Sequence, residues 1–456
     1  MAFVFYDLET SGTNTRFDQI LQFAALRTDA DLIVQERVEM SCRLDRHLVP
    51  HPGALATTRR SVAQVTAPEL QSHYAMMCDI ARLIESWSPA VFIGFNSIRF
   101  DEEMLRHSLY RTLHSPYLTS RPGNVRADAL TLARAIAFFS PGCLTVPTDA
   151  EGHPRFRLHM LNEANGGPAI EAHTALGDAE ATLALCTLVQ QSDPTCWSRF
   201  LQFASKKVVA ALIDQGSAFG LVRFRGNAPR PTAATLLGTT SDPNVRLCMD
   251  LLVDLDTLAA ADDAEIAAIL AAAGSPVVRV RVNACPCVCE LWDLPDDVKS
   301  GIDDGVLDQR AERVSADPRL GKRLLTLALA SETPYPRSPH VEERLYDVLP
   351  NPEDEELLRR FHATPWAERQ QVLNGMVDPR WRFLGARLIY LEAPQTLDQS
   401  RRERMDLAVA ARRRAAPGTV PWTSLDDAVA WIKRPESKCP PELMGEFAAL
   451  LADGGA

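Results

Sequence analysis

Two kinds of hydrophobic pattern alternate along the first 190 residues. Short runs rich in apolar, β-branched and aromatic residues predict strands at Ala2–Asp7, Ile20–Thr28 and Val91–Gly94. Between and after them, apolar residues recur at helical spacing, and this predicts helices over Ala75–Trp87, Asp101–Leu113, Ala127–Phe139 and Gly177–Gln190. Strands that alternate with helices in this way indicate an α/β domain, with a mixed central sheet flanked by helices.

The pattern changes after Ser192-Asp193-Pro194, which ends this first domain. From about residue 200 to 335, short strand-like runs alternate with one helix, and the predicted elements are Gly220–Phe224, Val245–Asp254, Asp263–Ala272 and Pro276–Val282. The proline-rich stretch Pro334–Pro339 predicts an extended linker.

Helical periodicity dominates the remainder of the chain. The predicted helices are Glu342–Leu349, Asp354–His362, Ala367–Gly375, Trp381–Leu391, Gln399–Ala411 and Ser424–Ile432. A chain of 456 residues is too long for one ordinary core. We therefore expect three domains, at residues 1–190, 200–335 and 340–456.

Composition narrows the class of protein. Hydrophobic residues make up 46% of the chain, which is ample for globular folding, and no stretch approaches the ~20 apolar residues that a membrane span needs. The N-terminal apolar run lacks a preceding basic region, so it predicts a first strand rather than a signal peptide. We expect a cytoplasmic protein without a membrane segment.

The ten cysteines do not suggest disulfides, because most lie singly in apolar contexts, where cysteine behaves as a small hydrophobe. The exception is Cys285, Cys287 and Cys289, which alternate along the chain and can share one face of a strand. Zinc sites usually need a second pair of ligands, and none is nearby in the sequence. Both a packed strand and a metal site remain open for these three.

Net charge does not exclude a nucleic-acid substrate. The chain carries a formal charge of −11, and residues 1–190 contain 16 Arg, no Lys and 21 acidic residues. Binding of a strand requires a local basic groove rather than a basic protein. The charge argues only against loose adhesion to duplex DNA.

Paired carboxylates are the strongest chemical signal in the sequence. Asp7 and Glu9 sit one residue apart at the end of an apolar strand, so both side chains point to the same side. Hard oxygen ligands of this kind suit magnesium or manganese. Asp101 follows a second apolar run, and His173 precedes Asp178 by five residues.

Each of these residues also has an ordinary structural interpretation. An Asp-x-Glu pair can occur on a strand without a metal, Asp101 can favour a helix N-terminus, and His173 can be a surface residue. Together, four carboxylates and a histidine predict a two-metal phosphodiester hydrolase, in which a general base activates water.

Three segments carry a family resemblance: Tyr6–Thr10, Gly94–Asp101 and His173–Ala179. They resemble the exonuclease motifs of the DEDD superfamily, in the subclass that has a histidine. Further stretches resemble the bacterial exodeoxyribonuclease I family within it, namely Gln22–Asp29, Leu48–Ala54 and Phe156–Gly166. The resemblance is strong over residues 1–190 and continues beyond them as fragments.

The resemblance implies a fold and an activity. It implies an RNase H-like exonuclease domain, an SH3-like α+β middle domain and a helical C-terminal domain. The implied activity is 3′→5′ degradation of single-stranded DNA to nucleoside 5′-monophosphates, in DNA repair and recombination. By position, Asp7, Glu9, Asp101 and Asp178 would hold two Mg²⁺ ions, with Mn²⁺ an alternative, and His173 would be the general base.

The same resemblance implies contacts with single-stranded DNA. The residues at the matching positions are Glu9, Thr10, Arg106, Tyr117, Arg134 and Arg157. A guanidinium such as that of Arg157 fits a phosphate well, although a surface salt bridge is the alternative. Tyr117 could stack on a base or simply cap the preceding Pro116. Relatives have an arginine-rich stretch where this chain has Arg387–Pro394, which puts the contacts of that region in doubt.

Two other functions are compatible with part of these residues. An RNA-trimming or proofreading exonuclease would share the catalytic domain, but it needs little beyond the first 190 residues. A catalytically silent nucleic-acid-binding or scaffold protein would not need the complete set of acids and histidine. The family resemblance further implies a monomer and an association with the acidic C-terminal tail of single-stranded DNA-binding protein.

Overall fold

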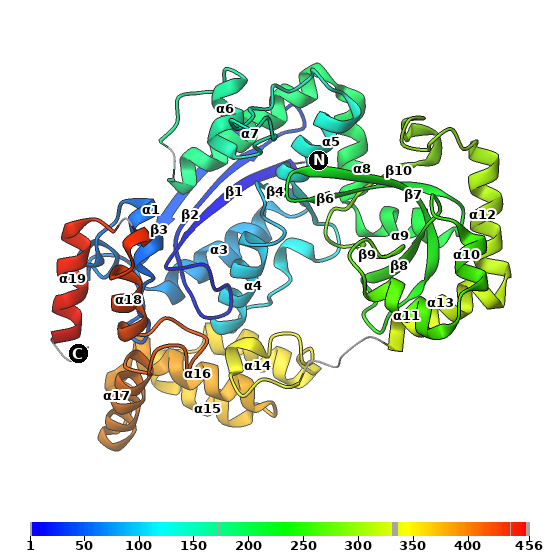
Figure 1. Ribbon diagram of the computed structural model, residues 1–456. Coiled ribbons are helices and arrows are strands. Elements are labelled where there is room, and N and C mark those ends of the chain that lie inside the picture. Colours follow the sequence, from blue (N-terminus) through cyan, green and yellow to red (C-terminus); the bar gives the residue numbers. More distant parts are fainter. Residues whose placement is uncertain (1, 172, 331–335, 438, 453–456) are drawn as a thin grey trace. The chain divides into compact units, whose positions relative to one another are not determined.

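The computed structural model describes residues 2–171, 173–330, 336–437 and 439–452. The chain forms two compact units: residues 1–124, 170–180 and 336–456 make the first, and residues 125–169 and 181–335 make the second. The first unit thus joins the N-terminal α/β segment to the C-terminal helices, two regions that are far apart in sequence (Figure 1). The predicted linker Pro334–Pro339 lies partly outside the described residues.

A mixed sheet is the centre of the first unit. Its strands are β1 (Ala2–Thr10), β2 (Ile20–Thr28), β3 (Val34–Ser41) and β4 (Ala90–Gly94). They lie in the order β3-β2-β1-β4, with β1 antiparallel to β2 and parallel to β4. The predicted mixed sheet is therefore confirmed. β3 was not predicted, because its charged, mostly exposed residues have no apolar period and the strand is held by pairing with β2.

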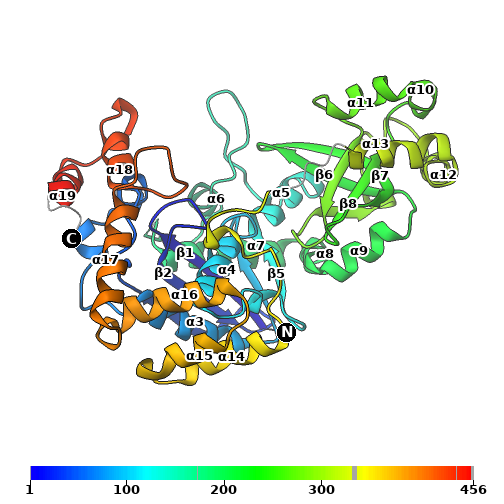
Figure 2. The ribbon, with the colours of Figure 1, turned by 90° about the horizontal axis from the view of Figure 1, so that it is seen from below.

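Helices cover one face of this sheet. The N-terminal helices of the unit are α1 (Pro52–Thr58), α2 (Val62–Val65), α3 (His73–Trp87) and α4 (Asp101–Arg111). Helices α3 and α4 lie beside β1 (Figures 1 and 2). Val4, Tyr6 and Leu8 of β1 share one apolar core with residues of both helices. Because side chains alternate along a strand, Asp7 and Glu9 project from the opposite face.

The C-terminal helices complete the core of the same unit. They are α14 (Pro352–Ala363), α15 (Arg369–Gly375), α16 (Pro379–Glu392), α17 (Gln399–Arg413), α18 (Leu425–Ile432) and α19 (Pro441–Ala452). Helices α14–α16 lie beside α3 and α4 (Figure 2). Tyr74 of α3 and Tyr110 of α4 are buried in a cluster with apolar residues of α14–α16. Leu55 of α1 and Val62 of α2 share a second apolar cluster with α18 and α19.

The helix predicted at Glu342–Leu349 is wrong, since only a short 3₁₀ turn forms, at Val341–Glu343. The backbone carbonyls of this segment bond to α4 instead: Tyr110 Oη donates to Val341 O at 3.0 Å, and His107 Nδ1 bonds to Glu342 O at 3.0 Å. Pro350 also disfavours helical backbone just before it. Tertiary contacts therefore override the local helical pattern.

The second unit is α+β and is built on an antiparallel sheet of order β10-β6-β7-β8-β9. The strands of this sheet are β6 (Phe219–Arg225), β7 (Ala228–Thr239), β8 (Val245–Asp250), β9 (Val277–Arg281) and β10 (Cys287–Glu290); the short strand β5 (Val125–Asp128) is not part of it. Its helices are α5 (Ala129–Phe139), α6 (Leu158–Ala164), α8 (Pro194–Ala204), α9 (Lys206–Asp214), α10 (Leu255–Ala260), α11 (Asp263–Ala271), α12 (Asp304–Ala316) and α13 (Arg323–Ala330). Helix α7 (Ala175–Ser192) begins in the first unit and continues into the second.

Two features of this unit bear on the predictions. β7 was not predicted, because Pro229 and Pro231 interrupt the hydrophobic pattern of a strand. Both prolines lie in the part of β7 that pairs with β6 only; the pairing of β7 with β8 begins at Ala234, so no hydrogen bond to β8 is lost at the prolines. Cys287 and Cys289 lie on β10, so the packed strand is confirmed for that stretch, and the thiols of Cys285, Cys287 and Cys289 form no disulfides.

Within the described part of the chain, no helix has the length and apolar character to cross a bilayer.

Candidate active site

Three carboxylates meet at the end of β1. Asp7 and Glu9 follow the buried residue Phe5 on this strand and lie opposite Ala24 and Gln22 of β2. Asp178 comes from the first turn of α7. One carboxylate oxygen from each of Asp7, Glu9 and Asp178 lies within 4.8 Å of the others. The strand alternation therefore places two acids on one face, and the fold brings the third to them.

Local contacts fix where α7 begins. Gln22 Oε1 accepts the Ala175 amide at 3.4 Å, so the residue opposite Glu9 also holds the start of the helix. Thr174 Oγ1 donates to Glu171 O at 2.8 Å and accepts from the Gly177 amide at 3.2 Å. A Cβ at Gly177 would lie 2.5 Å from Glu171 O, so glycine permits the close approach that positions Asp178.

Asp101 reaches the same region from α4. It is the first residue of that helix and is 5% exposed. The loop before it needs Gly94, whose Cβ would lie 2.6 Å from Ser97 Cβ and 3.0 Å from Tyr6 O. The next residue, Glu102, accepts hydrogen bonds from Tyr6 Oη and Thr119 Oγ1, each at 2.8 Å. These contacts anchor the first turn of α4 to β1 beside Asp7.

The electrostatics of the acidic group call for a cation. Burial raises the pKa of Asp7 well above its usual range, and the negative charges of Asp101, Asp178 and Glu9 raise it further. Burial and then the charge of Asp178 raise the pKa of Glu9 to about 8, while Arg60 acts in the opposite direction. Clustered carboxylates with raised pKa values are stabilised when a divalent ion neutralises them. Their hard oxygen donors fit Mg²⁺ or Mn²⁺.

His173 lies in the turn that precedes α7. Its side chain is exposed, and its backbone is left-handed, with φ of 65°. It is five residues before Asp178, which is itself one helical turn into α7. The role of His173 as a general base stays a prediction.

Two of the predicted DNA contacts of the first unit are engaged with protein groups. Arg106 is 7% exposed and lies 3.8 Å from Glu102 and 3.3 Å from Glu103, with its guanidinium over the Tyr117 ring at 5.5 Å. Thr10 is buried and its Oγ1 donates to Gly12 O at 2.7 Å. Arg106 therefore holds the N-terminal half of α4 together, and its contact with DNA stays a prediction.

Arg134 and Arg157 belong to the second unit. Arg157 is exposed and precedes α6, without a side-chain hydrogen bond to the helix end. Arg134 Nη2 donates to Gly226 O at 3.0 Å and Asn227 Oδ1 at 3.1 Å, and the guanidinium contacts the rings of Phe156 and Phe224. Arg157 is thus the more accessible of these two cations.

Arg60 and Tyr346 lie near the acidic residues but were not predicted as site residues. Arg60 is a half-buried cation whose charge lowers the pKa of Glu9. Tyr346 comes from the segment after the second unit, and its Oη donates to Glu103 Oε2 at 2.6 Å. Neither has a local signal in the sequence, because each reaches the catalytic region through tertiary packing.

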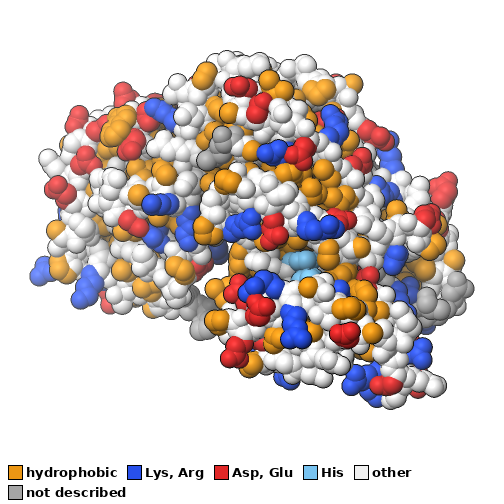
Figure 3. Space-filling model, turned by 180° about the vertical axis from the view of Figure 1, so that it is seen from behind, with side chains coloured by type: hydrophobic (Ala, Val, Ile, Leu, Met, Phe, Trp, Pro, Cys, Tyr) orange, Lys and Arg blue, Asp and Glu red, His pale blue; other side chains and the backbone are white. Residues whose placement is uncertain are grey.

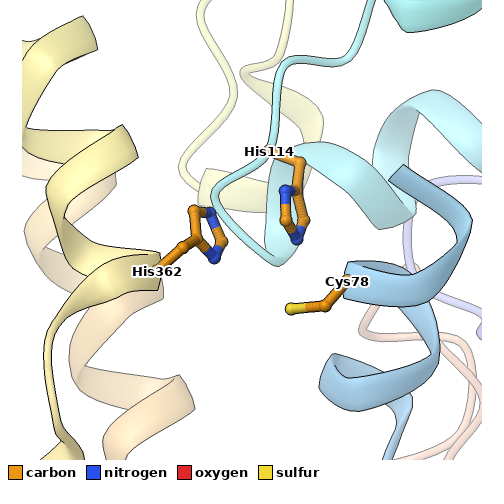
Figure 4. A group of neighbouring side chains, drawn as sticks. All are labelled: Cys78, His114 and His362. Atoms are coloured by element: carbon orange, nitrogen blue, oxygen red, sulfur yellow. The ribbon is translucent and has the colours of Figure 1, made fainter. Parts of the chain in front are cut away.

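A second group of metal-type donors, Cys78, His114 and His362, lies between α3 and α14 (Figure 4). Its geometry is that of a packed pair of rings: the imidazoles stack at 3.9 Å with an interplanar angle of 13°. Parallel rings do not aim two nitrogen lone pairs at one ion. His362 also uses both nitrogens, since Nδ1 bonds to Tyr74 Oη at 2.9 Å and Nε2 to Leu113 O at 3.1 Å. This arrangement does not fit a metal site.

Comparisons with known proteins agree with the geometry at β1. Residues 4–186 match the family described as Exonuclease (RNase_T). Exodeoxyribonuclease I of Haemophilus influenzae is 28% identical over 370 residues, and that of Escherichia coli is 28% identical over 364 residues; each alignment covers 76% of both chains.

Solved structures of similar fold cover the whole chain. Exonuclease I from Methylocaldum szegediense superposes with a TM-score of 0.86 at 24% identity, over 100% of both chains. Exonuclease I of E. coli, in complex with a dA16 oligonucleotide, superposes with a TM-score of 0.84, again at 24% identity and over 100% of both chains. The chain carries an exonuclease domain in residues 4–186 and is similar to exodeoxyribonuclease I over three quarters of its length.

Proposed function

We propose that this protein is a 3′→5′ exonuclease that degrades single-stranded DNA to nucleoside 5′-monophosphates. The observation that carries the proposal is the acidic group of Asp7, Glu9 and Asp178, with Asp101 beside it, on an exonuclease domain. The similar E. coli enzyme was solved with a deoxyadenosine oligonucleotide, which supports a DNA substrate. An RNA-trimming or proofreading role is not favoured, because the likeness to exodeoxyribonuclease I extends far beyond the catalytic domain.

The four acids and His173 divide the chemistry between them. Asp7, Glu9, Asp101 and Asp178 would hold two Mg²⁺ ions, which supply Lewis-acid stabilisation of the charge that develops on the phosphate. His173, on the exposed turn before α7, would take the proton of the attacking water as general base. Glu9 and Thr10 would contact the terminal nucleotide from the end of β1.

Arginine and aromatic side chains would hold the strand upstream of the scissile bond. Arg157 is exposed and can offer its guanidinium fork to a phosphate. Arg106, Tyr117 and Arg134 would also contact the single strand. On the face shown in Figure 3, positively charged side chains are interspersed with negatively charged ones, so binding would depend on local contacts.

The cellular setting extends the same proposal. A similar structure is that of SSB/exonuclease I in complex with an inhibitor, and it supports single-stranded DNA-binding protein as a partner here, by way of its acidic C-terminal tail in our proposal. We infer that the protein acts in the cytoplasm as a monomer, in DNA repair, with Mg²⁺ as its usual ion and Mn²⁺ as a substitute.

One substitution tests the proposal directly. Asp178→Asn removes one metal ligand and keeps the side-chain volume, so hydrolysis of labelled single-stranded DNA in saturating Mg²⁺ should be lost while binding persists. Asp31→Asn, an exposed acid in the turn after β2, is the matched control and should keep full turnover. Turnover of Asp178→Asn above a few per cent of wild type, or faster cleavage of RNA of equal sequence, would overturn it.

A further inference from the structure

Arginine side chains of α4, α16 and α17 gather around the buried Glu342 in the first unit. Arg387 Nη1 and Arg412 Nη1 both donate to Glu342 Oε1, at 2.8 and 3.2 Å. Burial lowers the pKa of the nearby Arg111 to about 10, while the charge of the same carboxylate acts in the opposite direction. Burial lowers the pKa of Arg412 to about 10; the charges of Arg387 and Arg111 act in the same direction and that of Glu342 against it. Glu342 thus accepts from Arg387 and Arg412 together, and Asp18 and Asp45 are further acids near Arg111. An anion bound beside this cluster would face several guanidinium groups.

An open cavity lies beside these cations. It has a volume of about 390 Å³, and Arg344, Arg387 and Arg412 line it together with Trp422 and Phe383. Among the described residues, the buried Nε and Nη2 atoms of Arg412 and Nη2 of Arg344 have no hydrogen-bond acceptor. Buried donors without acceptors are unfavourable, so a ligand with several acceptor oxygens would be stabilised here.

Aromatic rings form the other part of the cavity wall. The Arg412 guanidinium lies 4.2 Å from the centre of the Trp422 ring. Phe383 is 57% exposed, and the Arg387 guanidinium lies 5.1 Å from its ring centre. Alternating cations and exposed aromatic faces are typical of surfaces that bind single-stranded nucleic acid, because bases stack on the rings while cations hold phosphates.

The cavity is connected to the catalytic region by a segment that runs along α4. Tyr346 bonds to Glu103, Glu342 bonds to His107, and Val341 bonds to Tyr110. Nine residues separate the start of α4 from Tyr110, which corresponds to roughly 14 Å along the helix axis. Phe17, on the loop that follows Thr10, packs on Trp422 with ring centres 5.6 Å apart. The cavity and the acidic group therefore lie in one unit, a short distance apart.

We propose that this cavity binds a phosphate of the single strand upstream of the scissile bond, with a neighbouring base on Phe383. The inference rests on the proposed function. It assigns a DNA contact to a region in which the sequence had put such contacts in doubt, because Arg387–Pro394 lacks the arginines of its relatives. Arg412 and Arg344 supply the free donors, and Arg387 supports Phe383. An acidic peptide has the complementary charge too, but flat bases match the exposed ring better, and a test can separate the two ligands.

Binding of a fluorescent oligothymidylate to the full chain, with a chelator present to prevent hydrolysis, tests this inference. Arg412→Gln should reduce the slope of log K against log salt by about 0.7 for one lost phosphate contact. Phe383→Ala should weaken binding about 5- to 150-fold, by loss of stacking. Arg402→Gln, an exposed arginine on the same helix as Arg412, is the matched control and should bind as wild type does.

Further measurements make each outcome decisive. A dinucleotide substrate is too short to reach the cavity, so both variants should hydrolyse it at the wild-type rate. If the wild-type protein does not hydrolyse single-stranded DNA, that result contradicts the proposed function and not the cavity assignment. Wild-type oligothymidylate binding by both variants would overturn the cavity assignment. Loss of binding to a fluorescent acidic peptide, with unchanged DNA binding, would overturn it in favour of a protein partner. If Arg412→Gln does not fold, the exposed Phe383→Ala alone decides.

Discussion

Replacing Glu9 by glutamine should stabilise the metal-free protein at neutral pH. Burial and the nearby Asp178 raise the pKa of Glu9 from 4.5 to about 8 in the folded state. A raised pKa means that folding takes up a proton, so the stability from this group is complete below about pH 4.5 and is lost as the pH rises through 8. Each pH unit between the unfolded pKa and the folded pKa costs about 1.36 kcal/mol of folding free energy. Since pH 7 lies about 2.5 units above the unfolded pKa of 4.5, the loss of stability at pH 7 is on the order of 3 kcal/mol. The raised pKa of Asp7 adds to it in the same direction.

Chemical unfolding with a chelator at several pH values measures this effect. The wild type should lose stability steadily from pH 5 to pH 8, and Glu9→Gln should flatten that loss. Added Mg²⁺ should restore the wild type at pH 8 much more than the variant, because an ion stabilises the state that binds it. Glu69→Gln, at an exposed position of the same unit, should follow the wild type throughout. A metal-free wild type whose stability does not change over this range, or matches Glu9→Gln at every pH, would refute the reasoning.

Three further perturbations test other parts of the account. His173→Ala should lower turnover about 10²- to 10⁴-fold at neutral pH while binding of single-stranded DNA persists, and near-normal single-turnover rates would make His173 structural. Arg157→Ala should reduce the salt slope of single-strand binding by about 0.7, which a titration at four salt concentrations resolves; an unchanged slope would remove Arg157 from the strand contacts. A chain truncated after residue 190 should aggregate, because it exposes the apolar surfaces around Tyr110 and Leu55 that the C-terminal helices cover, and a stable, monodisperse product would contradict this packing.

The strand period was sufficient to predict the core of the site. Alternation along β1 places Val4, Tyr6 and Leu8 in one core and leaves Asp7 and Glu9 together on the other face. Spacing alone could not bring Asp178 to them, because that depends on Gln22 holding the start of α7. The family resemblance supplied this grouping, and the geometry of Asp7, Glu9 and Asp178 agrees with it.

Tertiary contacts account for what the sequence did not reveal. The segment Glu342–Leu349 has a helical pattern, but its backbone bonds to Tyr110 and His107 on α4. Arg106 was predicted to contact DNA, and its pairing with Glu102 and Glu103 was not foreseen. These partners come from other elements or from the preceding turn of the same helix, and hydrophobic periodicity carries no information about them.

Digestion of a 5′-labelled single-stranded DNA in Mg²⁺ tests the central claim most directly. The account predicts a ladder that shortens from the 3′ end, release of nucleoside 5′-monophosphates, protection by a 3′ block, and loss of all products with Asp178→Asn. Stalling is expected at a hairpin, because each base pair to be opened costs ~1–2 kcal/mol. Immediate release of the labelled 5′ nucleotide, equal digestion of blunt duplex, or products from the 3′-blocked strand would contradict the account.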